Sequence, residues 1–205
     1  MNPPRRVSQR DRRQAAERKI IDAAVTVLIE RGYAATTTLE VQKLAGVSRG
    51  VLLHYYGSRN ELINAAIRHL YATRIGEVRL QVAERASTSG LDEDWALLLW
   101  NVISGPVGRA CLELLVQAQR DAEISGYVVP LEREFGRANL ELCQALLGER
   151  RASHPRFREF CLVVINSMLG AAAGTTAPGT NDESRMLNAW RQLPDAYFGR
   201  ETTDD

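Results

Sequence analysis

Several features that would indicate an enzyme or a metalloprotein are scarce in this chain of 205 residues. It has three cysteines and three histidines, and neither set has the spacing of metal ligands. No His-Glu-x-x-His, Cys-x-x-Cys or glycine-rich loop before a lysine occurs. We therefore expect no enzyme, no bound metal and no other cofactor.

Long apolar runs are also lacking. The longest, Trp95 to Trp100 and Cys161 to Ile165, fall well short of the roughly 18 residues that cross a membrane. No apolar stretch follows the arginines near the N-terminus, so no secretory signal is predicted. Cys111, Cys143 and Cys161 lie among apolar neighbours, which is typical of reduced core thiols. These features together predict a cytoplasmic protein.

The charge of the chain is unevenly distributed although the formal net charge is only +1. Residues 1–74 contain 13 lysines and arginines against 6 acidic residues, whereas residues 75–205 contain 13 against 19. Clustered basic residues neutralise phosphates, so this asymmetry suggests that only the first third meets a nucleic acid. Solvated helix faces are the alternative explanation.

The first residues, 1–13, are rich in arginine and almost free of apolar side chains, which predicts a disordered basic arm. The arm is either a solvated tail or a segment that reaches along DNA. A helix is expected next, from about Arg12 to Arg31, because apolar residues recur there at helical spacing. Gly32 is a natural stop for it.

The following segment predicts two short helices joined by a tight corner. Thr37 and Glu40 stand at capping-box spacing, and the helix they begin runs to about Ala45. Ser48 caps a third helix, from Arg49 to about Tyr55, and Gly57-Ser58 precedes a fourth. In the corner, Gly46 supplies a positive φ and Val47 plugs the core beneath, an arrangement typical of a helix-turn-helix.

The rest of the chain is expected to be helical, so the fold class is all-α. No strand-like alternation occurs, and helix breaks are expected at residues 87–90, 105–106, 126, 148–155 and 175–179. Residues 95–100 and 160–174 are apolar nearly all round, so they are buried in a core or against a partner chain. The predicted domains are the arm 1–13, a three-helix DNA-binding domain 14–74 with its motif at 38–57, and a larger helical domain 75–205.

Residues 37–62, TTLEVQKLAGVSRGVLLHYYGSRNEL, resemble the DNA-binding motif of the tetracycline-repressor (TetR) family. The capping Thr, the Ala-Gly-Val-Ser corner, the following Gly, the aromatic pair and the Ser-Arg helix start all fall in register. The resemblance covers roughly residues 14–70, and the remainder is similar only in length and helicity. A structural bundle with the same corner is the alternative, but it has no need of an exposed arginine on the short third helix.

The resemblance implies that the third helix enters the major groove of DNA. Arg49 would pair with guanine, Gly50 would allow close approach and Val51 would meet a thymine methyl. Phosphate contacts would come from Tyr55, Arg59 and the helix start at Thr37. The implied DNA-binding residues are Thr37, Ser48, Arg49, Gly50, Val51, Leu53, His54, Tyr55 and Arg59.

Three residues of the motif are exceptions to these implied DNA contacts. Leu53 departs from the tyrosine that is common in the family, so one expected contact is in doubt. A packed or edge-exposed His54 is favoured over a phosphate contact. Tyr56 is expected to plug the core of the small domain.

For residues 75–205 the resemblance implies an effector pocket and a homodimer interface. The candidate pocket residues are Trp95, Leu99, Trp100, Gln117, Phe135 and Asn139, with ordinary core packing as the alternative. The candidate interface residues are Leu162, Ile165, Leu169, Gly170 and Ala173, where small residues allow two helices to approach closely, together with the helix 132–147. An intrachain core helix is the alternative.

The implied function is a homodimeric repressor that binds a palindromic operator of double-stranded DNA and is released by an unidentified small molecule. An activator, or an architectural or scaffold protein without a ligand, is the other possibility.

Overall fold

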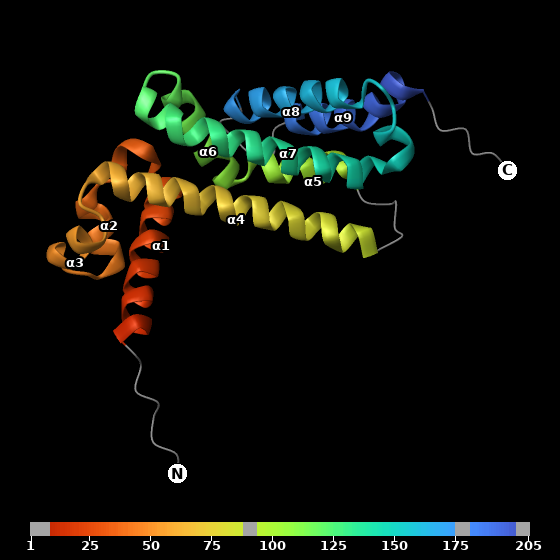
Figure 1. The fold of residues 1–205 in the computed structure, drawn as a ribbon. Coiled ribbons are helices and arrows are strands. Elements are labelled where there is room, and N and C mark those ends of the chain that lie inside the picture. Colours follow the sequence, from red (N-terminus) through yellow and green to blue (C-terminus); the bar gives the residue numbers. More distant parts are fainter. Residues whose placement is uncertain (1–8, 88–93, 175–180, 200–205) are drawn as a thin grey trace, which may run out of the picture. The chain divides into compact units, whose positions relative to one another are not determined.

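The computed structural model describes residues 9–87, 94–174 and 181–199, and these form nine α-helices and no strand (Figure 1). The all-α class predicted from the sequence is confirmed. The helices are α1 (Gln9–Ala35), α2 (Thr38–Ala45), α3 (Arg49–Tyr55), α4 (Arg59–Ser87), α5 (Trp95–Ser104), α6 (Pro106–Ala118), α7 (Ala122–Ala152), α8 (Phe157–Gly174) and α9 (Asn181–Phe198).

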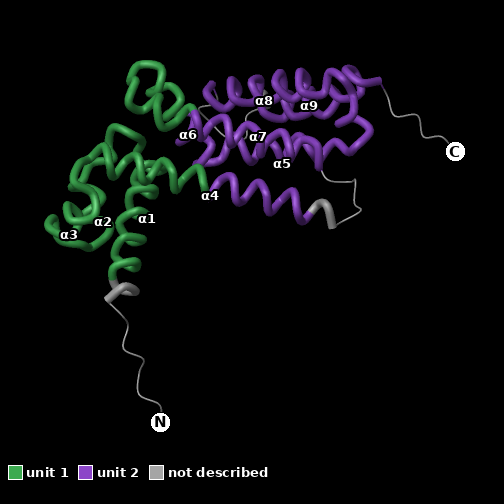
Figure 2. Tube along the Cα trace, viewed as in Figure 1, with its two compact units in different colours: residues 1–72, 113–129 green, residues 73–112, 130–205 purple. Residues whose placement is uncertain are grey.

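The chain divides into two compact units (Figure 2). Unit 1 comprises residues 1–72 and 113–129, and unit 2 comprises residues 73–112 and 130–205. The helices α4, α6 and α7 each contribute residues to both units. The functional assignment of the two predicted domains stays a prediction.

The first helix begins earlier than the sequence suggested. Residues 9–13, the end of the expected arm, belong to α1, because arginine and glutamine, which make up four of these five residues, are strong helix formers that extend the helix backward. Residues 1–8 of the arm lie outside the described residues. Gly32, the expected stop, has a φ of 81° and interrupts the helical backbone before one further turn to Ala35.

The later helix boundaries agree with the expected breaks at some positions and not at others. A boundary occurs at Gly105, where Pro106 is the first residue of α6, and Gly148 interrupts α7 with a φ of 80°. The expected break at Gly126 is wrong, because this residue lies inside α7 between the buried Ile124 and Val128. Burial of these neighbours outweighs the roughly 1 kcal/mol that glycine costs in a helix.

The boundary that the sequence reading missed lies between α6 and α7, at residues 119–121. Asp121 begins α7 by accepting hydrogen bonds at Oδ1 from the backbone N–H groups of Glu123 (2.9 Å) and Ile124 (3.2 Å). An aspartate in this role satisfies donors that would otherwise have no partner in the helix. The only sequence signal for this boundary is therefore one capping residue.

Unit 1 is built on a small apolar core beneath the first four helices. Ile20, Ala24 and Val27 of α1 pack with Val41 of α2, Leu52 of α3 and Leu62 of α4, and all of these side chains are nearly or completely buried. Tyr56 belongs to the same cluster with 9% exposure, as predicted, and burial raises the pKa of its hydroxyl. The core fixes the short helices α2 and α3, which are too short to be stable alone.

Unit 2 has a larger core that is rich in aromatic side chains. The ring centroids of Trp100 and Trp190 lie 5.2 Å apart, and the indole N–H of Trp100 donates to Glu183 Oε1 at 2.7 Å. Trp190 donates to Ser167 Oγ at 2.9 Å, which joins α9 to α8. Paired rings with satisfied indole groups give this core both apolar contact and directional bonds.

The three cysteines are buried and form no disulfide, as predicted. A hydrogen bond with Cys161, together with burial, raises the pKa of the Cys143 thiol. Both residues lie within the apolar core of unit 2. A protonated, enclosed thiol is a poor nucleophile and a poor metal ligand.

One helix of the described chain, α8, is long and apolar enough to cross a membrane by length and composition. Residues 160–174 were recognised as apolar nearly all round, but no uninterrupted apolar run of membrane-spanning length was expected, because Asn166 and Ser167 interrupt the apolar residues. Six of the 18 residues of α8 are buried within the protein.

We expect Gly46→Ala to lower the free energy of unfolding by about 1 kcal/mol. Gly46 has a φ of 64°, a left-handed conformation that costs an L-residue about that much, although no atom lies within 4 Å of the added methyl group. Gly50→Ala is the matched control, because Gly50 lies inside α3 and alanine favours a helix. Chemical denaturation measures the free energy of unfolding of both variants and of the wild type. A Gly46→Ala variant as stable as the wild type would contradict the strain at Gly46.

Candidate nucleic-acid interface

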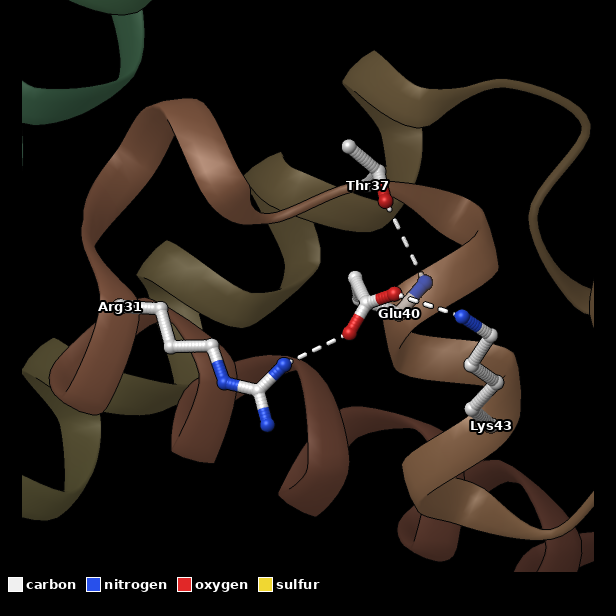
Figure 3. Close-up of polar contacts among 4 residues, drawn as sticks. All are labelled: Arg31, Thr37, Glu40 and Lys43. Carbon is white, nitrogen blue, oxygen red and sulfur yellow. Dashed lines mark hydrogen bonds and ion pairs between the residues drawn. The ribbon is translucent and has the colours of Figure 1, made fainter.

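The second helix begins at a side-chain cap. Thr37 has extended backbone angles, and its hydroxyl oxygen accepts a hydrogen bond from the Glu40 N–H at 3.2 Å (Figure 3). The reciprocal half of the expected capping box is absent, because the Thr37 N–H already donates to the carbonyl of Ala35 at 2.8 Å. The Glu40 carboxylate is thereby left for other partners.

The carboxylate of Glu40 forms ion pairs with two basic side chains. Glu40 accepts from Arg31 of α1 at 2.6 Å and from Lys43 of α2 at 3.0 Å (Figure 3). The hydrogen bond from Lys43 is the largest cause that holds the pKa of Glu40 below its usual value, and Arg31 adds to it. A lowered carboxylate pKa contributes stability above the ordinary pKa of the group, and this contribution disappears as the pH falls through the lowered pKa.

The corner between α2 and α3 has the predicted form. The N–H of Gly46 donates to Lys43 O at 3.3 Å, and the N–H of Val47 donates to Gln42 O at 3.3 Å, which closes α2. Val47 packs against the core of unit 1. Ser48 then caps α3 by accepting from the Val51 N–H at 3.2 Å.

The third helix has one buried side and one exposed side. Leu52 is 1% exposed and attaches the helix to the core. The side that remains in solvent carries predicted DNA-binding residues, with Val51 38% and Leu53 42% exposed. The exposed members of the predicted set are Ser48, Arg49, Gly50, Val51, Leu53 and His54. They form a single surface of about two helical turns, which is the size that enters a major groove.

Tyr55, predicted to contact phosphate, has a bond within the protein. Its hydroxyl donates to the backbone carbonyl of Arg13 in α1 at 3.1 Å. His54 is exposed and meets the edge of the Tyr55 ring, with the ring centroids 5.4 Å apart. The contact of Tyr55 with phosphate stays a prediction, and it would require the hydroxyl proton to leave Arg13.

Arg59, also predicted to contact phosphate, holds the connection between α1 and α2. Its Nε donates to the carbonyl of Thr36 and its Nη2 to the carbonyl of Tyr33, both at 2.9 Å. The guanidinium carbon lies 5.0 Å from the centroid of the Tyr33 ring. Sequence reasoning missed this structural role, because both carbonyls are more than 20 residues away. The contact of Arg59 with phosphate stays a prediction.

Glu113 is a second residue that the sequence reading did not single out. Its Oε1 accepts from the Tyr33 N–H at 2.9 Å, within unit 1. A Cβ on Gly32 would lie 2.9 Å from both carboxylate oxygens, so any larger residue would displace the Glu113 carboxylate, and the φ of 81° favours glycine as well. Residues 32–36 are thus held by side chains from α4 and α6.

The candidate effector residues are distributed over both units. Leu99, Trp100 and Asn139 are buried in unit 2, where Trp95 and Phe135 are partly buried against its core. Gln117 belongs to unit 1. The effector pocket stays a prediction.

The candidate interface residues of α8 fall into two groups. Leu162 (63% exposed), Gly170 and Ala173 lie on the exposed side, joined by Val163 (56% exposed). Ile165 and Leu169 are partly buried against the core of unit 2. Exposed bulky apolar side chains on a core helix are unusual for a monomer surface.

A capped two-helix corner with a solvent-facing, arginine-bearing second helix defines a helix-turn-helix DNA-binding protein. The family model described as "Bacterial regulatory proteins, tetR family" matches residues 20–66. The chain belongs to the TetR family of transcriptional regulators, and it regulates transcription by binding DNA.

Relatives and solved structures agree with this assignment. The regulator BetI of Rhizobium meliloti is 31% identical over 144 residues, which cover 65% of this chain and 68% of BetI. The regulator CymR of Pseudomonas putida is 28% identical over 182 residues, 82% of this chain and 83% of CymR. The Bacillus subtilis regulator FadR, solved in complex with stearoyl-CoA, has the same fold, with a TM-score of 0.62 at 16% identity over 90% of this chain and all of that one.

We expect Arg49→Ala to abolish sequence preference without loss of folding. The side chain is exposed and supports no core, whereas a bidentate contact with guanine is worth about 1–3 kcal/mol of discrimination. The affinities for a selected operator and for a scrambled duplex are measured, and their ratio gives the sequence preference. Arg49→Lys keeps the positive charge but lacks the two parallel N–H donors of arginine, and it serves as the control. An unchanged ratio in both variants would remove Arg49 from base reading.

We expect Arg59→Ala to lower the free energy of unfolding by about 1–3 kcal/mol, because two backbone carbonyls lose a charged donor. Arg59→Lys should recover only part of this loss, since one ammonium group cannot replace a fork of donors. Urea denaturation measures both. Wild-type stability in Arg59→Ala would show that the two bonds contribute nothing.

Proposed function

We propose that this protein is a homodimeric repressor that binds a palindromic operator in the cytoplasm and leaves it when a small molecule binds to unit 2. The observation that carries the proposal is the combination of one small DNA-reading surface per chain with an exposed apolar side on α8. One seven-residue recognition helix makes few base contacts, so tight and specific binding requires two of them.

The apolar side of α8 supports self-association. Leu162 and Val163 are more than half exposed, and Gly170 has no atom within 4 Å of the position where a Cβ would lie. A second copy of the helix would cover the exposed leucine and valine and approach closely at Gly170 and Ala173. An interface of this kind relates the two recognition helices by a two-fold axis, which a palindrome matches.

Release by a ligand is supported by the size of unit 2 and by family members of the same fold. FadR of Bacillus subtilis was solved with stearoyl-CoA, so this fold accommodates a small molecule in at least one relative. In a palindrome the two recognition helices lie about 34–36 Å apart, so a change of several ångströms in this separation prevents one of them from binding its half-site. Binding linkage then requires the effector to bind the DNA complex more weakly than the free protein.

We expect Leu162→Glu to produce a monomer with weak operator binding, because two buried carboxylates would face each other across the interface. Leu80→Glu is the matched control, since Leu80 of α4 is 65% exposed and lies outside the predicted interface. Sedimentation measures the oligomeric state, and binding to a duplex selected from random sequence measures the affinity.

Gly170→Leu tests the same interface by adding volume instead of charge. The protomer has room for the side chain, so only a partner helix would exclude it. Dimers in both variants with wild-type operator affinity would place the interface elsewhere. A selected operator without two-fold symmetry would contradict dimeric recognition altogether.

A further inference from the structure

Arg74 is an unusual residue within unit 2. Of the residues that the structure describes, it is the only charged one among those that are buried, with 9% of its surface exposed. An arginine side chain is permanently charged in proteins, so it cannot relieve burial by losing its proton. A buried charge without full pairing persists in proteins mainly where it has a function.

The guanidinium group of Arg74 is only partly paired. Its Nη1 donates to Glu77 Oε2 at 3.2 Å, and the side chain of Glu77 is 49% exposed. Its Nε and Nη2 are buried and have no hydrogen-bond partner among the described residues. These two nitrogens form one edge of the planar group, which presents two parallel N–H bonds to a carboxylate.

A second residue with an unsatisfied polar atom lies in the interior of the same unit. Asn139 of α7 is 3% exposed, and its Oδ1 is buried without a partner. An ion pair between Arg79 of α4 and Glu134 of α7, at 3.6 Å, joins the two helices that carry Arg74 and Asn139. Unpartnered buried polar atoms are rare in native proteins. The Nε and Nη2 donors of Arg74 therefore call for an acceptor, whereas Asn139 Oδ1 calls for a donor, which a carboxylate does not supply.

Both residues have apolar core residues next to them in the sequence. Ile75 and Val78 follow Arg74 on α4, and Ala138 and Leu142 flank Asn139 on α7, all within the core of unit 2. Glu77 is half exposed to solvent and compensates the charge of Arg74 only in part, so one further negative charge fits better than two, which favours a monocarboxylate over a phosphate dianion. The ligand that fits this environment therefore has a carboxylate and an apolar body.

We propose that the effector of this protein is a small amphipathic monocarboxylate whose carboxylate binds the Nε and Nη2 edge of Arg74. The identification of this ligand as the effector rests on the function proposed above. Binding itself does not depend on that function, because it is measured on the protein without DNA.

The probes are benzoate, phenylacetate and octanoate, each beside its neutral amide. We expect at least one carboxylate to raise the melting temperature of the wild-type protein, and its amide to have no effect. In Arg74→Met the affinity for that carboxylate, measured by calorimetry, should fall at least about tenfold, because a charged bidentate bond is lost. Arg109→Met removes an exposed arginine of unit 2 that lies on neither α4 nor α7, and it should bind as the wild type does.

Arg74→Lys provides a variant that keeps the charge should Arg74→Met fail to fold. It should bind the carboxylate more weakly than wild type, because it lacks the fork. The proposal is overturned if none of the three carboxylates binds, if an amide binds equally well, or if both Arg74 variants retain wild-type affinity. Binding of inorganic phosphate in place of the carboxylates would also overturn it.

Operator release separates this inference from the proposed function. A neutral compound that releases the operator, with no binding of the carboxylates, would leave the proposed function intact and overturn the assignment at Arg74. A carboxylate that binds through Arg74 and leaves operator affinity unchanged would support the site and contradict its role as effector site. Binding through Arg74 with loss of operator affinity supports both.

Discussion

The position of the helix-turn-helix depends on one short piece of backbone, residues 32–36, that is held mainly by polar groups. Gly32 turns the chain with a positive φ, and its carbonyl accepts from the hydroxyl of the fully buried Thr36 at 2.9 Å. Glu113 accepts a hydrogen bond from the Tyr33 N–H, and Arg59 donates hydrogen bonds to the carbonyls of Tyr33 and Thr36. The apolar core beneath fixes which faces are buried, but these bonds fix where α2 starts relative to α1. Hydrogen bonds to charged groups are about twice as strong as neutral ones, which suits a short segment with little apolar surface.

The local parts of the DNA-binding motif were predictable because their causes are local. A threonine or serine before a short apolar pattern caps a helix through the N–H three residues later, and both Thr37 and Ser48 do so. A glycine after the second helix takes the left-handed conformation, and Gly46 does so. Tyr56 was also predicted to lie in the core, and it is buried. The two caps and the left-handed turn each involve residues within four positions of one another.

The features that the sequence could not give involve distant residues or competition between weak local preferences. Glu113 meets Tyr33 across 80 positions, and no pattern in either segment names the other. Gly126 stays helical because its neighbours are buried, whereas Asp121 starts a helix with no glycine or proline to mark the place. Arg74 is the last residue of the predicted DNA-binding domain, and nothing in the sequence marks it as buried. Its burial follows from the extension of α4 into unit 2, which depends on tertiary packing.

The third helix has a further consequence for the balance between folding and recognition. Arg49 is the first residue of α3, at the positive end of the helix dipole, and the first turn contains no acidic residue to offset it. A cation at this end costs about 0.3–1 kcal/mol in the free protein. In the free protein, therefore, no acidic residue in the first turn of α3 compensates the positive charge of Arg49. In the proposed DNA complex, nearby phosphate groups would supply the missing negative charge, so part of the binding energy would come from compensating a charge that is unfavourable in the free protein.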